Sequence, residues 1–250
     1  MKTPITHNPN TAQASDTIPV AQPPPATKAW LHRLATIAIL GATVLYTHGA
    51  SLSDGLGLDD HWHYRTIRQS SWSLPELLDT TTIRSDALYE FWWQDHPVRF
   101  QYSRPLSVAL MKTVYALTDG NVFAQHSVNL VLHWIAACLV AAICTQLTKS
   151  WFWSLVGGIL FVVYPLSVNA VGWLAAQNMV LQTTLLLGAM LTYIRASNLN
   201  LDISATTLSL KTVDLDFRWF TLTVALWIGA LFSRENAIVL PAILVAMDVA

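Results

Sequence analysis

The chain has 250 residues, of which 53% are hydrophobic and 12% charged, and its formal net charge is −1. Soluble domains carry about 25% charged residues, so this composition is typical of a membrane protein. The near-neutral charge also excludes the strongly basic surface that nucleic-acid binding requires, and we expect no nucleic-acid partner.

The chain divides into two parts by composition. Residues 1–27 are rich in Thr, Asn, Gln, Ala and Pro and lack an apolar period, which predicts a disordered cytoplasmic tail. Residues 28–250 alternate long apolar runs with short charged segments, which predicts an all-α polytopic membrane protein. The chain is still apolar at Ala250, so we expect it to be incomplete at its C-terminus. The runs predict six spans, at about 30–50, 122–147, 151–168, 171–194, 219–233 and 237–250.

The basic residues predict an orientation. Lys28, Lys149 and the segment Arg195–Arg218 flank predicted spans, and the positive-inside rule assigns them to the cytoplasm. Residues 51–121 then form a long outer loop, in which the apolar run Leu106–Leu117 predicts a helix lying in the membrane interface. We expect a multi-pass protein of the inner (plasma) membrane with a cytoplasmic N-terminus and an extracytoplasmic active face.

Two adjacent carboxylates follow the first predicted span. Asp59 and Asp60 lie there, followed closely by His61 and His63. The segment has two interpretations: a hydrated polar loop, or an acid–base site at the membrane surface. Oxygen and imidazole ligands can also bind a divalent metal ion. A metal site built from Asp60, His61 and His63 is therefore a possibility that the sequence leaves open.

Polar side chains within apolar runs are costly and mark candidate sites. His126, Asn129 and His133 have i, i+3, i+7 spacing, which places them on one face of a helix. Hydrogen bonding between helices is an equally good interpretation of this face. Other polar candidates on the outer side of the membrane are Arg104, Asn169, Gln177, Arg234 and Glu235.

Several of these residues lie in segments that together resemble a known family. The segments are Leu58–Asp60, Tyr102–Leu106 followed by His126–His133, Phe161–Trp173, and Phe232–Pro241. In order and spacing they resemble the GT-C fold membrane glycosyltransferases that use polyprenyl-phosphate sugars. That family includes the protein O-mannosyltransferases and the tetratricopeptide-repeat mannosyltransferases. Its R-P-L, H-x-x-N-x-x-x-H and K-E-x-x-x-x-x-P runs are matched, with Arg234 in place of Lys, and the resemblance covers about Trp30 to Ala250.

The resemblance implies a GT-C-like helix bundle and an inverting sugar transfer. The donor would be a polyprenyl-phosphate-linked sugar and the acceptor a hydroxyl of a protein or glycan, at the bilayer surface. Asp59 would be the general base, and Asp60 would raise its basicity or bind a metal ion. Arg104, His126 or Arg234 would stabilise the phosphate leaving group. The other implied substrate-site residues are His133, Asn169, Gln177 and Glu235.

Three alternatives stay open. Tyr164, Asn169 and Gln177 stand where relatives commonly have His, Glu and Arg, which favours a catalytically inactive homologue or a membrane scaffold. A transporter or flippase would line a path through the bilayer with polar residues, whereas those here gather towards one side. A membrane di-metal oxidase would need closely spaced histidine boxes, which the sequence lacks.

Overall fold

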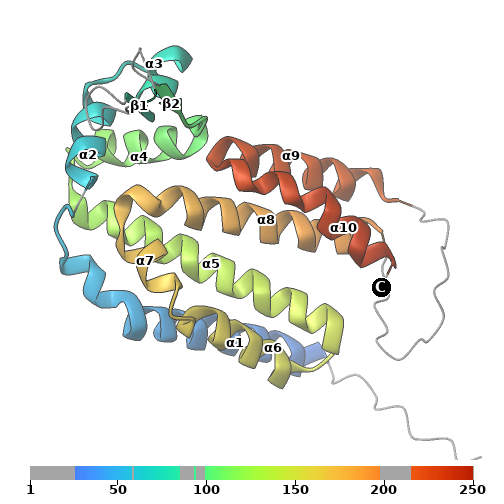
Figure 1. The fold of residues 1–250 in the computed structure, drawn as a ribbon. Coiled ribbons are helices and arrows are strands. Elements are labelled where there is room, and N and C mark those ends of the chain that lie inside the picture. The colour runs from blue at the N-terminus through green and yellow to red at the C-terminus, as the bar shows by residue number, and fades with distance from the viewer. Residues whose placement is uncertain (1–25, 58, 85–92, 94–98, 198–214, 250) are drawn as a thin grey trace, which may run out of the picture.

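The computed structural model describes residues 26–57, 59–84, 93, 99–197 and 215–249. Nearly all of the predicted tail, residues 1–25, lies outside this range. The described chain is mostly helical, and its helices form an elongated body with a smaller group of elements at one end (Figure 1).

Five helices form the body. Helix α5 packs against α1, α6 and α8, and α8 packs in turn against α9 (Figure 1). The segments that join these helices bring the end of α1 and the beginnings of α5 and α8 to the same end of the body. The helices are α1 (Ala26–His48), α5 (Val122–Thr148), α6 (Trp151–Val163), α8 (Gln177–Ala196) and α9 (Phe217–Ser233).

The predicted spans at 122–147 and 219–233 agree with α5 and α9, but those at 151–168 and 171–194 have different boundaries. Helix α6 ends at Val163 because Pro165 restricts Tyr164 to extended backbone, with φ −61° and ψ 122°. A short helix α7 (Ser167–Gly172) follows, and the chain is extended again at Trp173. A single 3₁₀ turn, η3 (Leu174–Ala176), then leads into α8. Residues 164–176 therefore interrupt the helical path from α6 to α8, and we name this segment the broken link.

The last predicted span also begins differently. The chain forms a 3₁₀ turn, η4 (Glu235–Val239), before α10 (Leu240–Val249) begins. Pro241 stands in the first turn of α10, where the missing N–H has no intrahelical partner to lose.

The predicted outer loop contains regular structure within its described residues. Two antiparallel strands pair with Thr82 opposite Gln101. Helix α4 agrees with the apolar run expected at Leu106–Leu117 and packs on α2, α3, α5, α8 and α9. The elements are η1 (Gly49–Ser53), α2 (Asp60–Gln69), α3 (Leu74–Asp79), β1 (Thr82–Arg84), β2 (Arg99–Gln101) and α4 (Pro105–Leu117).

Three apolar clusters pack between the described elements. The largest lies between α1, α5 and α6 and includes the buried residues Leu40, Val44, Leu130 and Val162. The third joins α5 to α8 through Ile143, Leu191 and Ile194. Helix α6 approaches α1 closely at Gly158, where an added Cβ would lie 2.9 Å from the Leu40 side chain. Small residues at such contacts are typical of helices that pack within membranes.

The second cluster joins α2 and α4 to η3. Its buried members include Ile67, Met111 and Leu174. The buried ammonium of Lys112 caps the end of α2, where it donates to the carbonyl oxygen of Ile67 (3.0 Å) and to Ser70. Carbonyl groups at a helix C-terminus lack intrahelical partners, so this lysine satisfies them. The elements around the broken link are thus fixed by both apolar and polar contacts.

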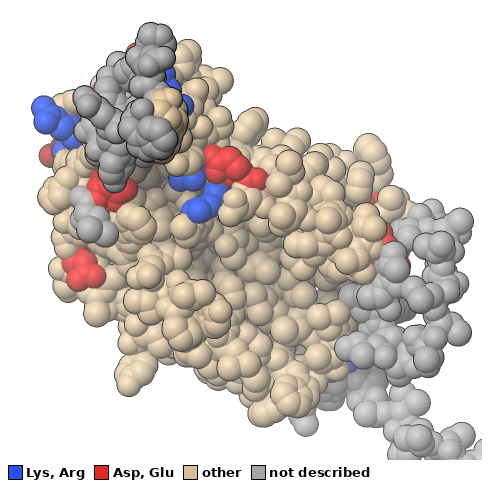
Figure 2. Space-filling view, in the orientation of Figure 1, with Lys and Arg blue, Asp and Glu red and all other residues tan. Residues whose placement is uncertain are grey.

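Within the described residues, three helices are long and apolar enough to cross a membrane: Ala29–Ser53, Val122–Thr148 and Leu174–Ala196. Helices α4, α6 and α9 are apolar but shorter. Large apolar side chains such as Leu45, Leu160 and Phe232 are exposed on the body. Figure 2 shows few charged side chains on the visible face of the body and a concentration of them near α2–α4. A surface this apolar fits burial in lipid, and the inside–outside orientation stays a prediction.

Candidate functional site

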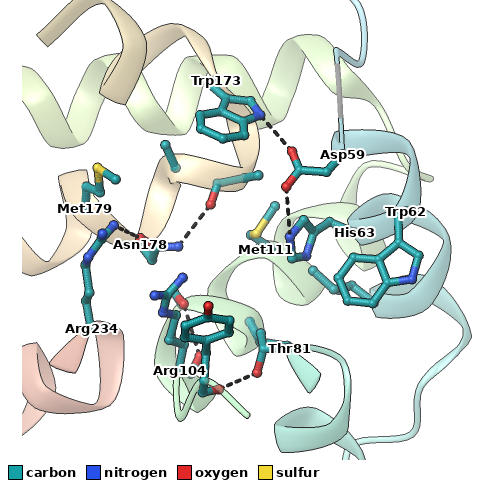
Figure 3. A pocket seen from close by; sticks show the side chains of 16 residues that line it. Asp59, Trp62, His63, Thr81, Arg104, Met111, Trp173, Asn178, Met179 and Arg234 are labelled. Carbon is teal, nitrogen blue, oxygen red and sulfur yellow. Dashed lines mark hydrogen bonds and ion pairs between the residues drawn. The ribbon is translucent and has the colours of Figure 1, made fainter. Parts of the chain in front are cut away.

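A pocket of about 350 Å³ lies where α2, α4 and the start of α8 meet (Figure 3). Its three formally charged lining residues come from distant parts of the chain: Asp59 precedes α2, Arg104 precedes α4 and Arg234 follows α9. Trp62, Tyr102 and Trp173 add aromatic surface; the remaining polar lining residues are His63, Thr81, Ser107 and Asn178.

Asp59 presents its carboxylate to this pocket. It precedes α2 but makes no side-chain capping bond to that helix. Instead, its Oδ1 atom accepts a hydrogen bond from the indole Nε1–H of Trp173 at 3.0 Å (Figure 3). Half of the side chain, 50%, stays exposed. The carboxylate is therefore held from one side and accessible from the other, as a general base must be.

Asp60 has a different role from the one expected. It is 3% exposed, and both carboxylate oxygen atoms accept backbone hydrogen bonds. Its Oδ1 accepts from the Ala175 N–H at 2.7 Å and its Oδ2 from the Gly57 N–H at 3.1 Å. We name this pair of contacts the Asp60 clasp. It ties the start of α2 to the broken link before α8 and so sets where Asp59 meets Trp173.

His63 lies one helical turn after Asp59. Its Nε2 atom is 3.9 Å from Asp59 Oδ2, beyond hydrogen-bond distance. Burial lowers the pKa of His63 below its ordinary value, and Arg104 lowers it further, while Asp59 and Asp60 raise it. The lowered pKa favours the uncharged ring, and at 3.9 Å its interaction with Asp59 is weak.

Two guanidinium groups occupy the other side of the pocket (Figure 3). Arg234 donates to Asn178 Oδ1 at 2.9 Å. Arg104 donates to Glu235 Oε2 through Nε (3.4 Å) and Nη2 (3.3 Å) and stacks over the Tyr102 ring, with Cζ 4.7 Å from its centroid. Burial first, and then the positive charge of Arg104, lower the pKa of Arg234. Guanidinium groups stay charged at neutral pH, so two cations share one wall of the pocket.

The structure does not bring the other candidates into this pocket. Asn169 is exposed on α7, whereas His126, His133 and Gln177 are buried within the helical body. Glu235 reaches the site only through its contact with Arg104. The expectation that all of them line one substrate site is thus not supported by their positions.

The buried candidates form a polar band where α5 packs against α1, α6, α7 and α8 instead. Gln125 Nε2 donates to Gln177 Oε1 at 3.2 Å, and Asn129 Nδ2 donates to the Val171 carbonyl oxygen at 3.1 Å. His133 stacks on Phe161 and meets His48 edge to face. Several polar atoms of this band, including both ring nitrogens of His126, have no hydrogen-bond partner among the described residues. Asn129 therefore agrees with the interhelical hydrogen-bonding interpretation of the histidine face, whereas His126 makes no such bond among the described residues.

The possible metal site lacks a suitable set of donors. His61 is exposed, and both oxygen atoms of Asp60 already accept backbone hydrogen bonds. Within the described ranges, no group of three or more His, Cys, Asp or Glu side chains lies close enough to hold a metal ion. Asp60, His61 and His63 therefore do not fit the metal interpretation.

Trp173 and Asn178 contact charged groups of the pocket but were not among the candidate site residues. Trp173 contacts the Asp59 carboxylate, and Asn178 contacts Arg234. The extended backbone of Trp173 interrupts the helix and releases its ring from the regular helical face. The signal for Trp173 was its position at the end of Phe161–Trp173, one of the segments that resemble the glycosyltransferase family.

In comparisons, the chain matches no known protein family, no curated protein and no solved structure.

Proposed function

We propose that the protein is an integral membrane glycosyltransferase with a GT-C-like helix bundle. It moves a sugar from a polyprenyl-phosphate donor to an acceptor hydroxyl on the extracytoplasmic side. One observation carries the proposal: a single pocket has an accessible carboxylate, Asp59, on one wall and two guanidinium groups, Arg104 and Arg234, on the other. The apolar surface of the surrounding helices supports a lipid-linked donor.

The carboxylate acts on the acceptor hydroxyl, and the two guanidinium groups act on the leaving phosphate. Asp59 removes the proton from the acceptor hydroxyl while the oxygen atom of that hydroxyl forms a bond to the anomeric carbon. The bond from that carbon to the phosphate oxygen breaks, and its electron pair leaves with the polyprenyl phosphate. Attack opposite the leaving group inverts the anomeric centre. No step of this scheme uses a metal ion.

Arg104 and Arg234 stabilise the leaving group. Negative charge grows on the phosphate as the bond breaks, and fixed cations in a partly dry pocket stabilise such charge strongly. Asn178 holds Arg234, and Glu235 together with the Tyr102 ring holds Arg104. Both cations are thus oriented before substrate binds, which reduces the reorganisation that the reaction needs.

The test uses membranes that contain the full chain and a panel of polyprenyl-phosphate sugars. Mass spectrometry follows donor loss and glycan gain for the wild type, Asp59→Asn and Arg234→Gln. We expect Asp59→Asn to lower turnover by about 10²- to 10⁴-fold and Arg234→Gln by about 10²-fold. Asp54→Asn is the matched control, since Asp54 is exposed and does not line the pocket.

A binding measurement distinguishes the role of Arg234 from that of Asp59. Arg234→Gln should weaken binding of a short polyprenyl phosphate that carries no sugar, because that ligand presents only the anionic group. Asp59→Asn should leave this binding unchanged. Wild-type turnover that neither substitution alters would contradict the assignment of the pocket, and absence of turnover with every donor would contradict the proposed function.

A further inference from the structure

Trp173 is the described side chain that restrains the proposed base. Trp173 lies in the extended break between α7 and η3, with φ −94° and ψ 116°. The backbone on either side is fixed: the Trp173 N–H donates to the Asn169 carbonyl, and the Ala176 N–H donates to the Trp173 carbonyl. The indole is therefore carried by a rigid turn, and its N–H reaches Asp59 at 3.0 Å.

The other neighbours of Asp59 leave its carboxylate free to rotate. The side chain forms no capping bond with α2, and His63 Nε2 is 3.9 Å away, too far for a hydrogen bond. Both carboxylate oxygen atoms of Asp60 accept hydrogen bonds from backbone N–H groups and so do not contact Asp59. Among the described residues, the indole of Trp173 thus provides the hydrogen bond that selects one orientation of Asp59.

We propose that Trp173 is a positioning residue that holds Asp59 Oδ1, so that Oδ2 faces the acceptor hydroxyl as the proton-accepting atom. This role rests on the proposed function. The geometry supports it: the indole N–H bonds Oδ1, Asp59 lines the pocket with half of its side chain exposed, and the neighbour of Oδ2, His63 Nε2, is 3.9 Å away. A base that samples several rotamers spends less time aligned with the hydroxyl, and misalignment of reacting groups slows the chemical step.

The sharpest perturbation removes the indole N–H and keeps the ring shape. Benzothienylalanine replaces the N–H of tryptophan with sulfur, and it can be placed at position 173 of the full chain. We expect kcat to fall about 10-fold, because without the N–H the carboxylate spends less time aligned with the acceptor hydroxyl. KM for donor and acceptor should stay unchanged, since the indole N–H contacts neither. Trp173→Phe should give the same kcat with an added loss of thermal stability.

A second readout does not depend on turnover. In a chain labelled with 5-fluorotryptophan, Trp173→Phe identifies the ¹⁹F resonance of residue 173. That resonance should shift in Asp59→Ala and stay in place in Asp54→Asn. Trp153→Phe, on the exposed start of α6, controls for loss of a tryptophan and should leave kcat unchanged.

The outcomes separate the two proposals. A ¹⁹F shift in Asp59→Ala together with a kcat loss in the benzothienylalanine chain supports the role of Trp173. Equal kcat in that chain and the wild type, or a resonance indifferent to Asp59→Ala, overturns the role of Trp173 while the proposed function stands. Absence of wild-type turnover with every donor overturns the proposed function and, with it, this role.

Discussion

The Asp60 clasp makes a quantitative prediction for Asp60→Asn. The asparagine keeps the size of the side chain, but its NH₂ group faces one of the two backbone N–H groups that the carboxylate now satisfies. At least one hydrogen bond to a charged group is lost, at a cost of about 1.5–3 kcal/mol. Since about 1.4 kcal/mol corresponds to a tenfold change, local opening around the link should become about 10- to 150-fold more frequent.

Amide hydrogen exchange measures this opening directly. In detergent micelles, peptides that contain Ala175 should exchange faster in Asp60→Asn than in the wild type. Two substitutions control for the lost charge: Asp59→Asn alters a half-exposed side chain that accepts from an indole, and Asp54→Asn alters an exposed one. Both should leave the Ala175 amide protected. Equal exchange in all four proteins would refute the conclusion that Asp60 holds the link.

Three further predictions follow from buried polar groups. Burial lowers the pKa of His63, so the folded state binds fewer protons than the unfolded state below the ordinary value of 6.5. Thermal stability should therefore fall as the pH drops from 6.5 towards the folded pKa, and it should fall less in His63→Gln. Lys112→Met should lower the unfolding free energy by about 2–4 kcal/mol, because it leaves buried carbonyl groups unpaired. The control is Lys149→Met at an exposed position, which should change the unfolding free energy by less than about 0.5 kcal/mol. Denaturant titration compares the two variants. Gln177→Leu should cost about 1–3 kcal/mol by stranding the amide of Gln125, and the double variant Gln125→Leu/Gln177→Leu should recover part of that cost in the same titration. An additive double variant would contradict the paired arrangement.

The sequence predicted best what depends on local pattern. The range of α5 followed from one long apolar run that ends before Lys149, and the structure adds that the Asn121 side chain caps its start. Asp59, Arg104 and Arg234 belonged to a larger set of polar residues predicted on one side of the bilayer, and the structure places these three, with His63, in one pocket. Such arguments use only chain length and hydropathy.

The functional difference between neighbouring residues was not predictable in this way. Asp59 and Asp60 read alike in the sequence, yet about 100° separates successive side chains on a helix, and one faces the pocket while the other faces the link. Gln177 and Asn178 divide similarly between the helical body and the pocket. The direction of each depends on where α2 and α8 begin, and the break at Trp173 that sets the start of α8 falls inside a run expected to continue as a helix.

The Asp60 clasp also has an evolutionary consequence. Both of its donors are backbone N–H groups, which every residue except proline supplies. An alanine at position 57 would place its Cβ 3.9 Å from the Asp60 carboxylate, an ordinary contact distance. Selection on this contact should therefore fix the aspartate and leave positions 57 and 175 free to vary. Among homologous sequences, position 60 should be nearly invariant without any covarying partner, so inference of contacts from correlated substitutions would overlook this connection between α2 and η3.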